Sequence, residues 1–280
     1  MPTREGRVGA PMKPLDCRIP DDRREPLTEE ERAVFAWQFP VAGFGEAGQE
    51  RLKASSILVT RCGGLGGSVA YQLAAAGVGR LILAHGGDIQ ASDLNRQILM
   101  THAGIGHSRV ESAARRLKEL NPALRITAVP ENVLDSNVAR LVRDADLVVD
   151  CAPMFGERYL LNDECVLQRK PMVEAAVFEL EAHLTTVIPG VTPCLRCLYP
   201  ETSPTWTRRF PVFGAVSATV GALAAMEAIK LLAGFGETLA GILLACDLGN
   251  MSFRRFRIRR DPHCPECGGV DVWSSVLGGS

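Results

Sequence analysis

Short apolar runs alternate with longer amphipathic or small-residue segments through the first two thirds of the chain. The apolar runs have the length and β-branched content of buried strands, and the segments between them have the period of helices. Strands are predicted at residues 57–59, 81–84, 125–129, 146–150 and 172–176. Helices are predicted at residues 68–76, 109–120, 138–143 and 159–168, and two shorter ones begin near Thr28 and Phe44. This alternation predicts an α/β fold with a doubly wound, Rossmann-like, mainly parallel sheet.

The pattern changes after Phe178. Strands are predicted at residues 184–188, 242–246 and 253–258, and the last of them alternates as a half-exposed strand would. Residues 215–232 form a long helix that is apolar nearly all round, so it is predicted to be buried. Its Gly and Ala content suits packing against a second copy of the chain. The second half is therefore expected to be more antiparallel than the first.

The two ends of the chain have little apolar periodicity. Residues 1–28 are rich in Pro, Arg and Asp and are predicted to be a mobile arm, one that could cross to a partner subunit. Thr28 then precedes three glutamates, which suits a helix N-terminus. Residues 271–280 are predicted to be a tail.

The stretch Ile57–Leu83 reads as strand, glycine-rich turn, helix and strand. Such a turn places backbone N–H groups and a helix N-terminus where a phosphate can sit. In the usual G-x-G-x-x-G pattern the first glycine makes the tight turn, but Arg61 stands there, followed by Gly63 and Gly66. A residue with a side chain must therefore make this turn. The alternative is a βαβ unit with no ligand.

Composition narrows the class of protein. The chain has 280 residues, of which 46% are hydrophobic and 22% charged, and its net charge is −1. A large core is thus available, and the near-neutral charge argues against a dedicated nucleic-acid binder. No apolar run is expected to reach the roughly 20 residues of a membrane span, and no secretory signal is visible. Five of the nine cysteines show no framework spacing, which predicts a reducing cytoplasm.

Two C-x-x-C motifs provide four thiolates. They are Cys194–Cys197 and Cys264–Cys267, about 70 residues apart. Four cysteine ligands close a tetrahedral zinc shell with no open position, so the predicted zinc site is structural rather than catalytic. The alternative is two separate redox or unpaired C-x-x-C motifs.

Several further motifs occur in a fixed order along the chain. They are the glycine-rich βαβ unit, SDLNRQ at 92–97, the G-x-x-R-V-E-S-A segment at 106–113, DLVVDC at 146–151, the first C-x-x-C, AMEAIKLL at 225–232 and C-P-x-C. In this order they resemble the ThiF/MoeB/HesA adenylyltransferase family, which is related to ubiquitin-activating enzymes. The resemblance covers about residues 30–270. It implies that 29–178 is a nucleotide-binding Rossmann-like part and 179–270 a carrier-binding and zinc-binding part of the same domain.

The resemblance implies that ATP and magnesium bind at the carboxyl edge of the sheet, and that the substrate is the C-terminal glycine of a ubiquitin-like or sulfur-carrier protein. By position, Gly63, Gly64 and Gly66 would line the phosphates. Ser92, Asp93 and Arg96 would meet the ribose and phosphates, and Arg109 stands where the family has a phosphate-binding lysine. Arg96 and Arg109 are the predicted catalytic cations. The alternatives are a loop-anchoring salt bridge for Arg96 and a solvated helix residue for Arg109.

The chain departs from the family pattern at the nucleotide site. His85 and Gly87 replace two acids after the second strand, and Asp88 is the nearest substitute. Pro153 stands where the family has its magnesium-binding acid, with Asp150 and Glu157 as nearby but poor replacements.

Two more positions differ. Trp37 stands in place of the N-terminal arginine finger, and Arg61 in place of the first glycine. Two readings follow. Either Arg61, His85 and Arg109 form a rebuilt nucleotide site, or this is a non-catalytic member that binds a carrier protein or completes a heterodimer with an active paralogue. A homodimer is the other assembly open to it.

Two other functions are disfavoured. Residues 198–216 contain no cysteine, and Cys62 is expected to be a packing residue, so no thioester relay is predicted. An NAD-dependent oxidoreductase is the weakest alternative, because the acid that would bind the ribose 2′-hydroxyl is absent.

Overall fold

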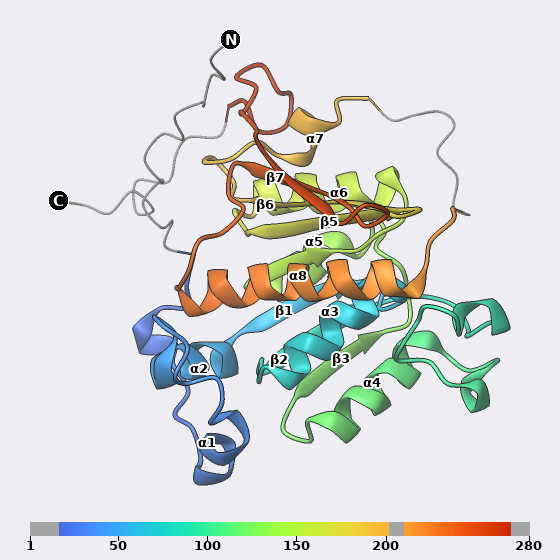
Figure 1. Cartoon of the computed structure of the whole chain (residues 1–280). Helices are drawn as coiled ribbons and strands as arrows, with labels where there is room; N and C mark the ends of the chain where they lie inside the picture. The colour runs from blue at the N-terminus through green and yellow to red at the C-terminus, as the bar shows by residue number, and fades with distance from the viewer. Residues whose placement is uncertain (1–16, 202–209, 270–280) are drawn as a thin grey trace.

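A single eight-stranded sheet runs through the molecule (Figure 1). The computed structural model describes residues 17–201 and 210–269. The strand order is β3-β2-β1-β4-β5-β6-β7-β8. The strands are β1 (Ser56–Thr60), β2 (Arg80–Ala84), β3 (Arg125–Val129), β4 (Leu147–Asp150), β5 (Met172–Phe178), β6 (Glu181–Val187), β7 (Ile242–Asp247) and β8 (Ser252–Arg257).

The first five strands are parallel and the last three antiparallel. Val59 on β1 is in register with Leu83 on β2 and with Val149 on β4. The order 3-2-1-4-5 is that of a doubly wound Rossmann sheet. From β5 to β8 each strand pairs antiparallel with the next. The predicted fold class, a parallel first half continued by a more antiparallel second half, is confirmed.

Helices cover both faces of the sheet. In Figure 1, α3, α4 and α8 lie in front of it and α5 and α6 behind it. The helices are α1 (Glu29–Phe35), α2 (Gly45–Ala54), α3 (Gly64–Ala75), α4 (Arg109–Leu120), α5 (Val138–Arg143), α6 (Phe155–Leu167), α7 (Leu195–Leu198) and α8 (Gly214–Ala233), with 3-10 turns at Asp21–Arg23, Ala91–Asp93 and His102–Gly104. Sequence analysis missed α7 and the 3-10 turns, which are too short to carry a helical period.

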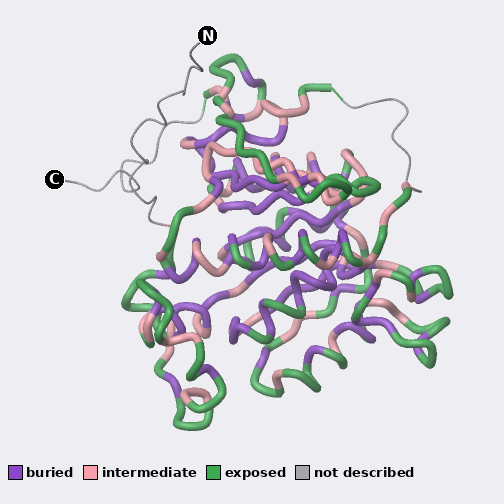
Figure 2. The backbone as a smooth tube through the Cα atoms, viewed as in Figure 1, coloured by how far each residue is buried: buried purple, intermediate pink, exposed green. Residues whose placement is uncertain are grey.

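Alternate residues of each central strand enter different cores, because side chains alternate across a strand. Val59 and Val149 pack with the α3, α4 and α8 layer, whereas Leu58 and Val148 pack with α5 and α6. Figure 2 shows the central strands buried and β8 exposed at the sheet edge. Strands β1, β2 and β4 are thus buried on both faces, as is typical of a parallel sheet, whereas β3 at the edge is partly exposed.

Helix α8 packs closely on α3. A Cβ added at Gly221 would lie 2.6 Å from the Ser68 Cβ and 2.8 Å from the Leu65 carbonyl oxygen, so only glycine allows this approach. At 20 residues, α8 is long and apolar enough to cross a membrane, by length and composition alone. The expectation that no run reaches that length was wrong. Buried core helices pass the same test, and 56% of its most apolar window is buried here.

The described part of the predicted N-terminal arm, residues 17–28, packs on the body of the protein. Ile19 is buried, and its N–H donates to the Leu232 carbonyl oxygen at 2.9 Å. Residues 1–16 and the whole predicted tail, residues 271–280, lie outside the described residues. Thr28 forms a capping box with Glu31, as its position before the glutamates predicted. Farther along, Trp37 is 94% exposed.

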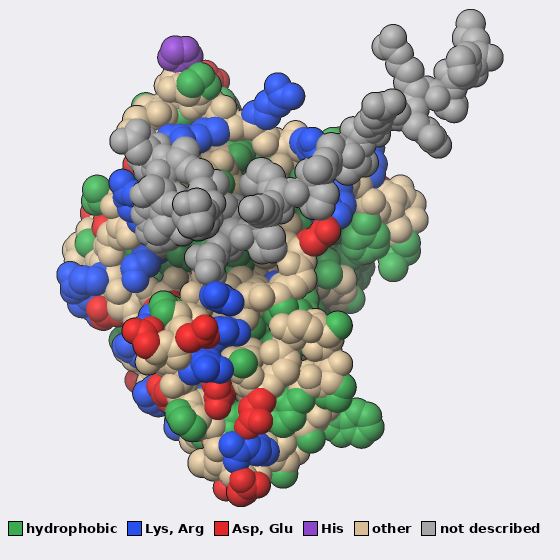
Figure 3. Space-filling view, turned by 90° about the vertical axis from the view of Figure 1, so that its left-hand side faces the viewer, with side chains coloured by type: hydrophobic (Ala, Val, Ile, Leu, Met, Phe, Trp, Pro, Cys, Tyr) green, Lys and Arg blue, Asp and Glu red, His purple; other side chains and the backbone are tan. Residues whose placement is uncertain are grey.

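Lys and Arg side chains are interspersed with Asp and Glu on the face shown in Figure 3. The ion pairs of the described residues include Arg32–Glu46 and Arg24–Glu50. Exposed pairs of this kind contribute about 0–1 kcal/mol each.

Candidate functional site

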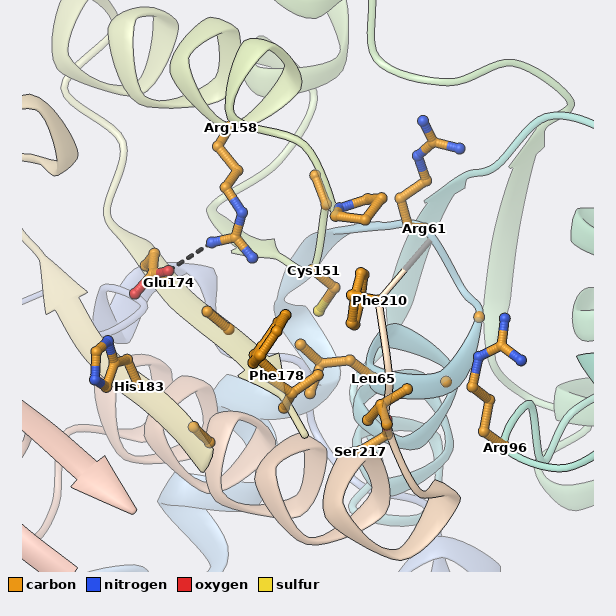
Figure 4. A pocket seen from close by; sticks show the side chains of 18 of the residues that line it. Arg61, Leu65, Arg96, Cys151, Arg158, Glu174, Phe178, His183, Phe210 and Ser217 are labelled. Carbon is orange, nitrogen blue, oxygen red and sulfur yellow. Dashed lines mark hydrogen bonds and ion pairs between the residues drawn. The ribbon is translucent and has the colours of Figure 1, made fainter. Parts of the chain in front are cut away.

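A cavity of about 270 Å³ opens at the carboxyl ends of the central parallel strands. This is the edge at which open α/β sheets bind their ligands. Arg61 and Arg96 lie on one side of the cavity, with Glu174 and His183 on the other and Phe178 and Phe210 between them (Figure 4). Other residues that line it are Gly63, Gly64, Leu65, His85, Gln97, Cys151, Ala152, Pro153, Phe155, Arg158, Ala176, Val177, Glu181, Ala182, Tyr199, Val212 and Ser217.

The glycine turn forms one wall of the cavity. Arg61 makes the tight turn in the left-handed region, with φ at +57°, and Gly63 and Gly64 follow it at the N-terminus of α3. The predicted strand–turn–helix is therefore present, and its helix N-terminus can accept an anion. Gly66 does not line the cavity. It lies in the first turn of α3, where a Cβ would be 2.5 Å from the Arg61 carbonyl oxygen.

A buried ion pair holds the Arg61 side chain. Its Nε lies 3.0 and 2.8 Å from the two carboxylate oxygens of Glu157 on α6. Glu157 also accepts the Val133 N–H at 3.3 Å. The carboxylate therefore ties the glycine turn to α6 and to the segment after β3. This pair explains how an arginine is held at a left-handed position that normally favours glycine.

Substituting Gly66 with alanine should destabilise this turn by about 1–3 kcal/mol, because the added methyl group overlaps two backbone oxygens, of Arg61 and Thr60. Chemical denaturation of the purified variant would measure the loss. Gly156→Ala on α6 is the matched control, since a Cβ there meets nothing within 4 Å and alanine favours a helix. Equal stability of the two variants would contradict the account.

The predicted ribose and phosphate residues form a network centred on Asp93. Its carboxylate accepts hydrogen bonds from Arg109 Nε at 3.1 Å and Nη2 at 2.8 Å, and from Gln97 Nε2 at 2.7 Å. Arg96 Nη2 lies 3.4 Å away, and the Gln90 N–H donates at 2.9 Å. Of these groups, only Arg96 and Gln97 line the cavity. Asp93 and Arg109 lie behind its wall.

The two predicted catalytic cations thus differ in position. Arg96 lines the cavity and donates to the Ser92 carbonyl oxygen at 2.7 Å, so it anchors its loop and also faces the site. Ser92 itself is exposed and does not line the cavity. Arg109 is neither solvated nor in the cavity wall, because its guanidinium is held by Asp93.

The Asp93 carboxylate should stabilise the fold in a pH-dependent way. Burial raises its pKa, but the Gln90 N–H and Arg109 outweigh burial, and the net pKa lies below the ordinary 3.8. A lowered folded-state pKa stabilises the protein above the unfolded pKa, and the stabilisation is lost as the pH falls through the folded value. Asp93→Asn should therefore cost about 1–3 kcal/mol at neutral pH and progressively less below about pH 4.

Denaturation of wild type and variant in parallel across that pH range would check this, because effects common to both proteins cancel. Asp88→Asn is the control, since Asp88 is exposed and outside the cavity. Its cost should stay within about 0.5 kcal/mol. The free energies of unfolding of wild type and Asp93→Asn should converge at acid pH. If their difference does not shrink there, Asp93 is not an ionised carboxylate paired with Arg109.

Three of the positions expected to depart from the family pattern, Arg61, His85 and Pro153, line the cavity, whereas Gly87 and Trp37 do not. His85 is buried in its wall, and its Nδ1 lies 3.7 Å from the Cys62 Sγ. Burial raises the pKa of Cys62 to about 12, so this thiol is a poor nucleophile, in keeping with a packing role. Gly87 has φ at +83°, and a Cβ there would meet Arg109 Nη1 at 2.8 Å. The conformation at Gly87 and the packing of Arg109 therefore disfavour an acid at this position.

Two carboxylates lie side by side, one at the end of β4 and the other in the first half of β5. Asp150 and Glu174 are register partners, and both are fully buried. Arg158 Nη1 lies 2.5 Å from Glu174 Oε1 and 3.5 Å from Asp150 Oδ2. Burial raises the pKa of Asp150 to about 6 and raises that of Glu174 as well. Sequence analysis missed Glu174, although a lone acid in the apolar run MVEAAVF was a usable signal.

Aromatic side chains enclose the far side of the cavity. The rings of Phe178 and Phe210 stack at 6.4 Å, and the Glu179 N–H donates to the Pro211 carbonyl oxygen at 2.7 Å. The segment that leads into α8 is thereby pinned to the end of β5. His183 Nδ1 lies 3.0 Å from the Tyr199 hydroxyl, and burial lowers the pKa of His183.

The four cysteines of the two C-x-x-C motifs come together. The Sγ atoms of Cys194 and Cys264 are 3.7 Å apart and those of Cys197 and Cys267 are 3.4 Å apart, and all four lie within 4.8 Å of one another. Four thiolates at about 2.3 Å from a common centre would be about 3.8 Å apart. This cluster can hold a metal ion, and the alternative of two separate motifs is wrong. His263 is exposed and is not part of the cluster.

The fold and the site together define one class of α/β protein. Its members combine a Rossmann-like half that carries a glycine turn with an antiparallel half, in the same sheet, that carries a four-cysteine cluster. The chain belongs to the ThiF family, whose model matches residues 35–266. The predicted family membership is confirmed.

Known relatives support the same grouping. The chain is 51% identical to "Protein HesA, heterocyst" of Trichormus variabilis over 248 residues, or 88% of this chain and 92% of that protein. It is 40% identical over 250 residues, 86% of this chain and 92% of the relative, to the sulfur carrier protein adenylyltransferase of Thermus thermophilus. The crystal structure of E. coli MccB with ATP has a TM-score of 0.70 and 25% identity, and the match covers 79% of this chain and 69% of that chain.

Proposed function

We propose that the protein is an ATP-dependent adenylyltransferase that acts on the C-terminal glycine of a ubiquitin-like or sulfur-carrier protein. The observation that carries the proposal is the cavity, which joins a glycine turn and Arg96 at one end to an aromatic end lined by Phe178 and Phe210. The similarity to a sulfur carrier protein adenylyltransferase over nearly its whole length supports the same class of reaction.

Each part of the cavity has a role in this reaction. The Gly63 and Gly64 turn and the N-terminus of α3 would hold the phosphates, and Arg96 would neutralise their charge. The tail carboxylate would attack the α-phosphate, forming a carboxyl–phosphorus bond as the bond to pyrophosphate breaks. Asp93 and Arg109 would position Arg96 and its loop rather than touch the nucleotide. Magnesium would screen charge on the phosphates, but the family's position for its ligand is Pro153, which cannot bind it.

The four-cysteine cluster is proposed to hold one structural zinc ion per chain. Four thiolates with no open coordination position are typical of such sites. Reduced cysteines are typical of a reducing compartment, which agrees with the proposed cytoplasmic location. A dimer, either of two copies or with a paralogue, is proposed as the assembly, with α8 as a candidate contact through its exposed Met226.

Calorimetry with ATP and magnesium, followed by pyrophosphate exchange in the presence of a carrier protein tail, tests the enzyme proposal. Binding and exchange are expected for the wild type. Arg96→Ala should reduce exchange about 10²- to 10³-fold, whereas Arg116→Ala, an exposed substitution on α4, should not. Exchange that is the same in Arg96→Ala and wild type would contradict the assigned role of Arg96.

The second candidate is a non-catalytic member that binds a carrier protein or an active paralogue. It is favoured by Pro153, which lacks the magnesium-binding acid, and by Arg109, whose guanidinium is committed to Asp93. No ATP binding, combined with tight association with a carrier protein or paralogue, would establish it and exclude the enzyme.

A further inference from the structure

The carboxylates of Asp150 and Glu174 are arranged in a way that the rest of the fold does not explain. Parallel pairing of β4 with β5 places the two residues in register, so their side chains leave the same face of the sheet as neighbours. Both are fully buried. Two ionised carboxylates on neighbouring strands repel each other strongly when they are buried out of contact with water. An amide or a pair of apolar side chains would therefore serve a purely structural role better.

The positive charge around Asp150 and Glu174 does not balance two ionised carboxylates. Arg158 is the one cation in an ion pair with either carboxylate among the described residues, and its Nη1 is shared between them. The four carboxylate oxygens differ in their partners. Arg158 Nη1 lies 2.5 Å from Glu174 Oε1 and, more distantly, 3.5 Å from Asp150 Oδ2. Asp150 Oδ1 accepts the Ala152 N–H at 2.9 Å, but Asp150 Oδ2 and Glu174 Oε2 have no hydrogen-bond partner in the described part of the chain.

We propose that Asp150 and Glu174 bind a divalent metal ion, Mg²⁺ or Mn²⁺, through these two oxygens. Two carboxylates are the hard, anionic ligands that such ions prefer, and the ion would complete its shell with water or substrate oxygens. The ion neutralises the excess negative charge that Arg158 leaves. The four-cysteine cluster cannot take its place, because soft thiolates select other metals.

The position of the pair relates it to the cavity. Glu174 and Arg158 line the cavity, and Asp150 is three residues before Pro153, at the end of β4. A metal ion here would lie at the ligand-binding edge of the sheet without any carboxylate at position 153. That it serves the phosphates of ATP rests on the proposed function, whereas metal binding by the pair does not.

Mn²⁺ titration of the full chain tests the proposal. The protein is first loaded with zinc, so that the cysteine cluster is filled, and is kept free of nucleotide at about pH 8, well above ordinary carboxyl pKa values. Free Mn²⁺ is counted by electron paramagnetic resonance. One bound Mn²⁺ per chain, displaced by Mg²⁺, is expected. Glu174→Gln and Asp150→Asn should each weaken binding at least about tenfold.

Glu157→Gln is the matched control. Glu157 is a buried carboxylate close to the same cavity, but its oxygens already have Arg61 and the Val133 N–H as partners. Its amide variant should bind Mn²⁺ as the wild type does. Unchanged thermal unfolding transitions in the metal-free state would show that the amide variants are folded.

The proposal is overturned if the wild type binds no Mn²⁺, which would mean that a proton neutralises the pair, or if Glu174→Gln binds it undiminished. The result of the Mn²⁺ titration can be distinguished from the result of the pyrophosphate-exchange assay that tests the enzyme. Mn²⁺ bound by Asp150 and Glu174 without pyrophosphate exchange would leave the metal site standing and remove the adenylyltransferase. Exchange by a protein whose Asp150 and Glu174 bind no Mn²⁺ would do the reverse.

Discussion

Replacing both Cys264 and Cys267 with serine is expected to abolish zinc binding and to lower the melting temperature by roughly 10 °C or more. The two thiolates close the shell begun by Cys194 and Cys197, and they join the end of the described chain to α7. In small zinc-binding peptides such sites contribute about 10–16 kcal/mol, and a few kcal/mol suffice for this shift in a chain of this size. Metal analysis and calorimetric unfolding would measure both effects.

Cys246→Ser provides the control for the cysteine double variant. Cys246 is buried on β7 but is outside the metal-binding group. The variant should keep its zinc and lose at most a few degrees. A metal-free double variant that melts with the wild type would show that the cluster has no structural role.

The cysteine cluster is also expected to influence the cavity. Tyr199 follows the first C-x-x-C by two residues, lines the cavity and contacts His183 through its hydroxyl. Its carbonyl oxygen accepts a hydrogen bond from the Tyr159 hydroxyl at 2.6 Å. Loss of the metal would free the segment that holds Tyr199. The cluster therefore links the antiparallel half of the sheet to the site.

The second large effect is expected from Arg158→Ala, which should destabilise the protein by about 3–5 kcal/mol in the absence of added divalent metal. The substitution leaves Asp150 and Glu174 buried side by side without their counterion, and removing one partner of a buried ion pair carries a cost of this size. The hydrogen bond of Arg158 to the Ala175 carbonyl oxygen, 3.0 Å long, is lost as well. Denaturant unfolding at neutral pH would measure the difference.

Two comparisons separate charge imbalance from lost packing. Adding Asp150→Asn to Arg158→Ala removes one of the two uncompensated charges and should recover part of the loss. Arg116→Ala removes an exposed pair with Glu119 and should cost less than about 1 kcal/mol. If the double variant is no more stable than Arg158→Ala, the carboxylates are not charged in the folded protein.

Much of the fold follows from local pattern. The apolar runs and their spacing predicted every strand to within a few residues, because buried parallel strands need continuous apolar stretches. The helix Arg109–Leu120 has the predicted bounds, as its apolar stripe and the Asn-Pro that follows it require. Sequence also indicated the family and supplied the four candidate cysteine ligands, because motif order and ligand count are properties of the chain itself, but only the structure shows that the two C-x-x-C motifs meet.

The contacts within the site were beyond the reach of sequence. Asp93 and Arg109 are 16 residues apart, and Arg61 and Glu157 are 96 apart, so only folding could show that these charges neutralise each other. Position along a motif predicts that Gly66, Ser92 and Arg109 bind the nucleotide, and none of the three is among the residues that line the cavity. Register between β4 and β5, a long-range property, is what brings Asp150 next to Glu174.

The sequence by itself determined the alternation of strands and helices, the glycine turn and the set of thiolates, since each depends on residues close together or on composition. The tertiary structure decided which charges are already paired and which are not. That distinction depends on packing between distant segments in a low-dielectric interior, where one missing partner outweighs any local preference. In the glycine turn, Arg61 has Glu157 as its counterion. The carboxylates of Asp150 and Glu174, in contrast, share a single arginine, Arg158.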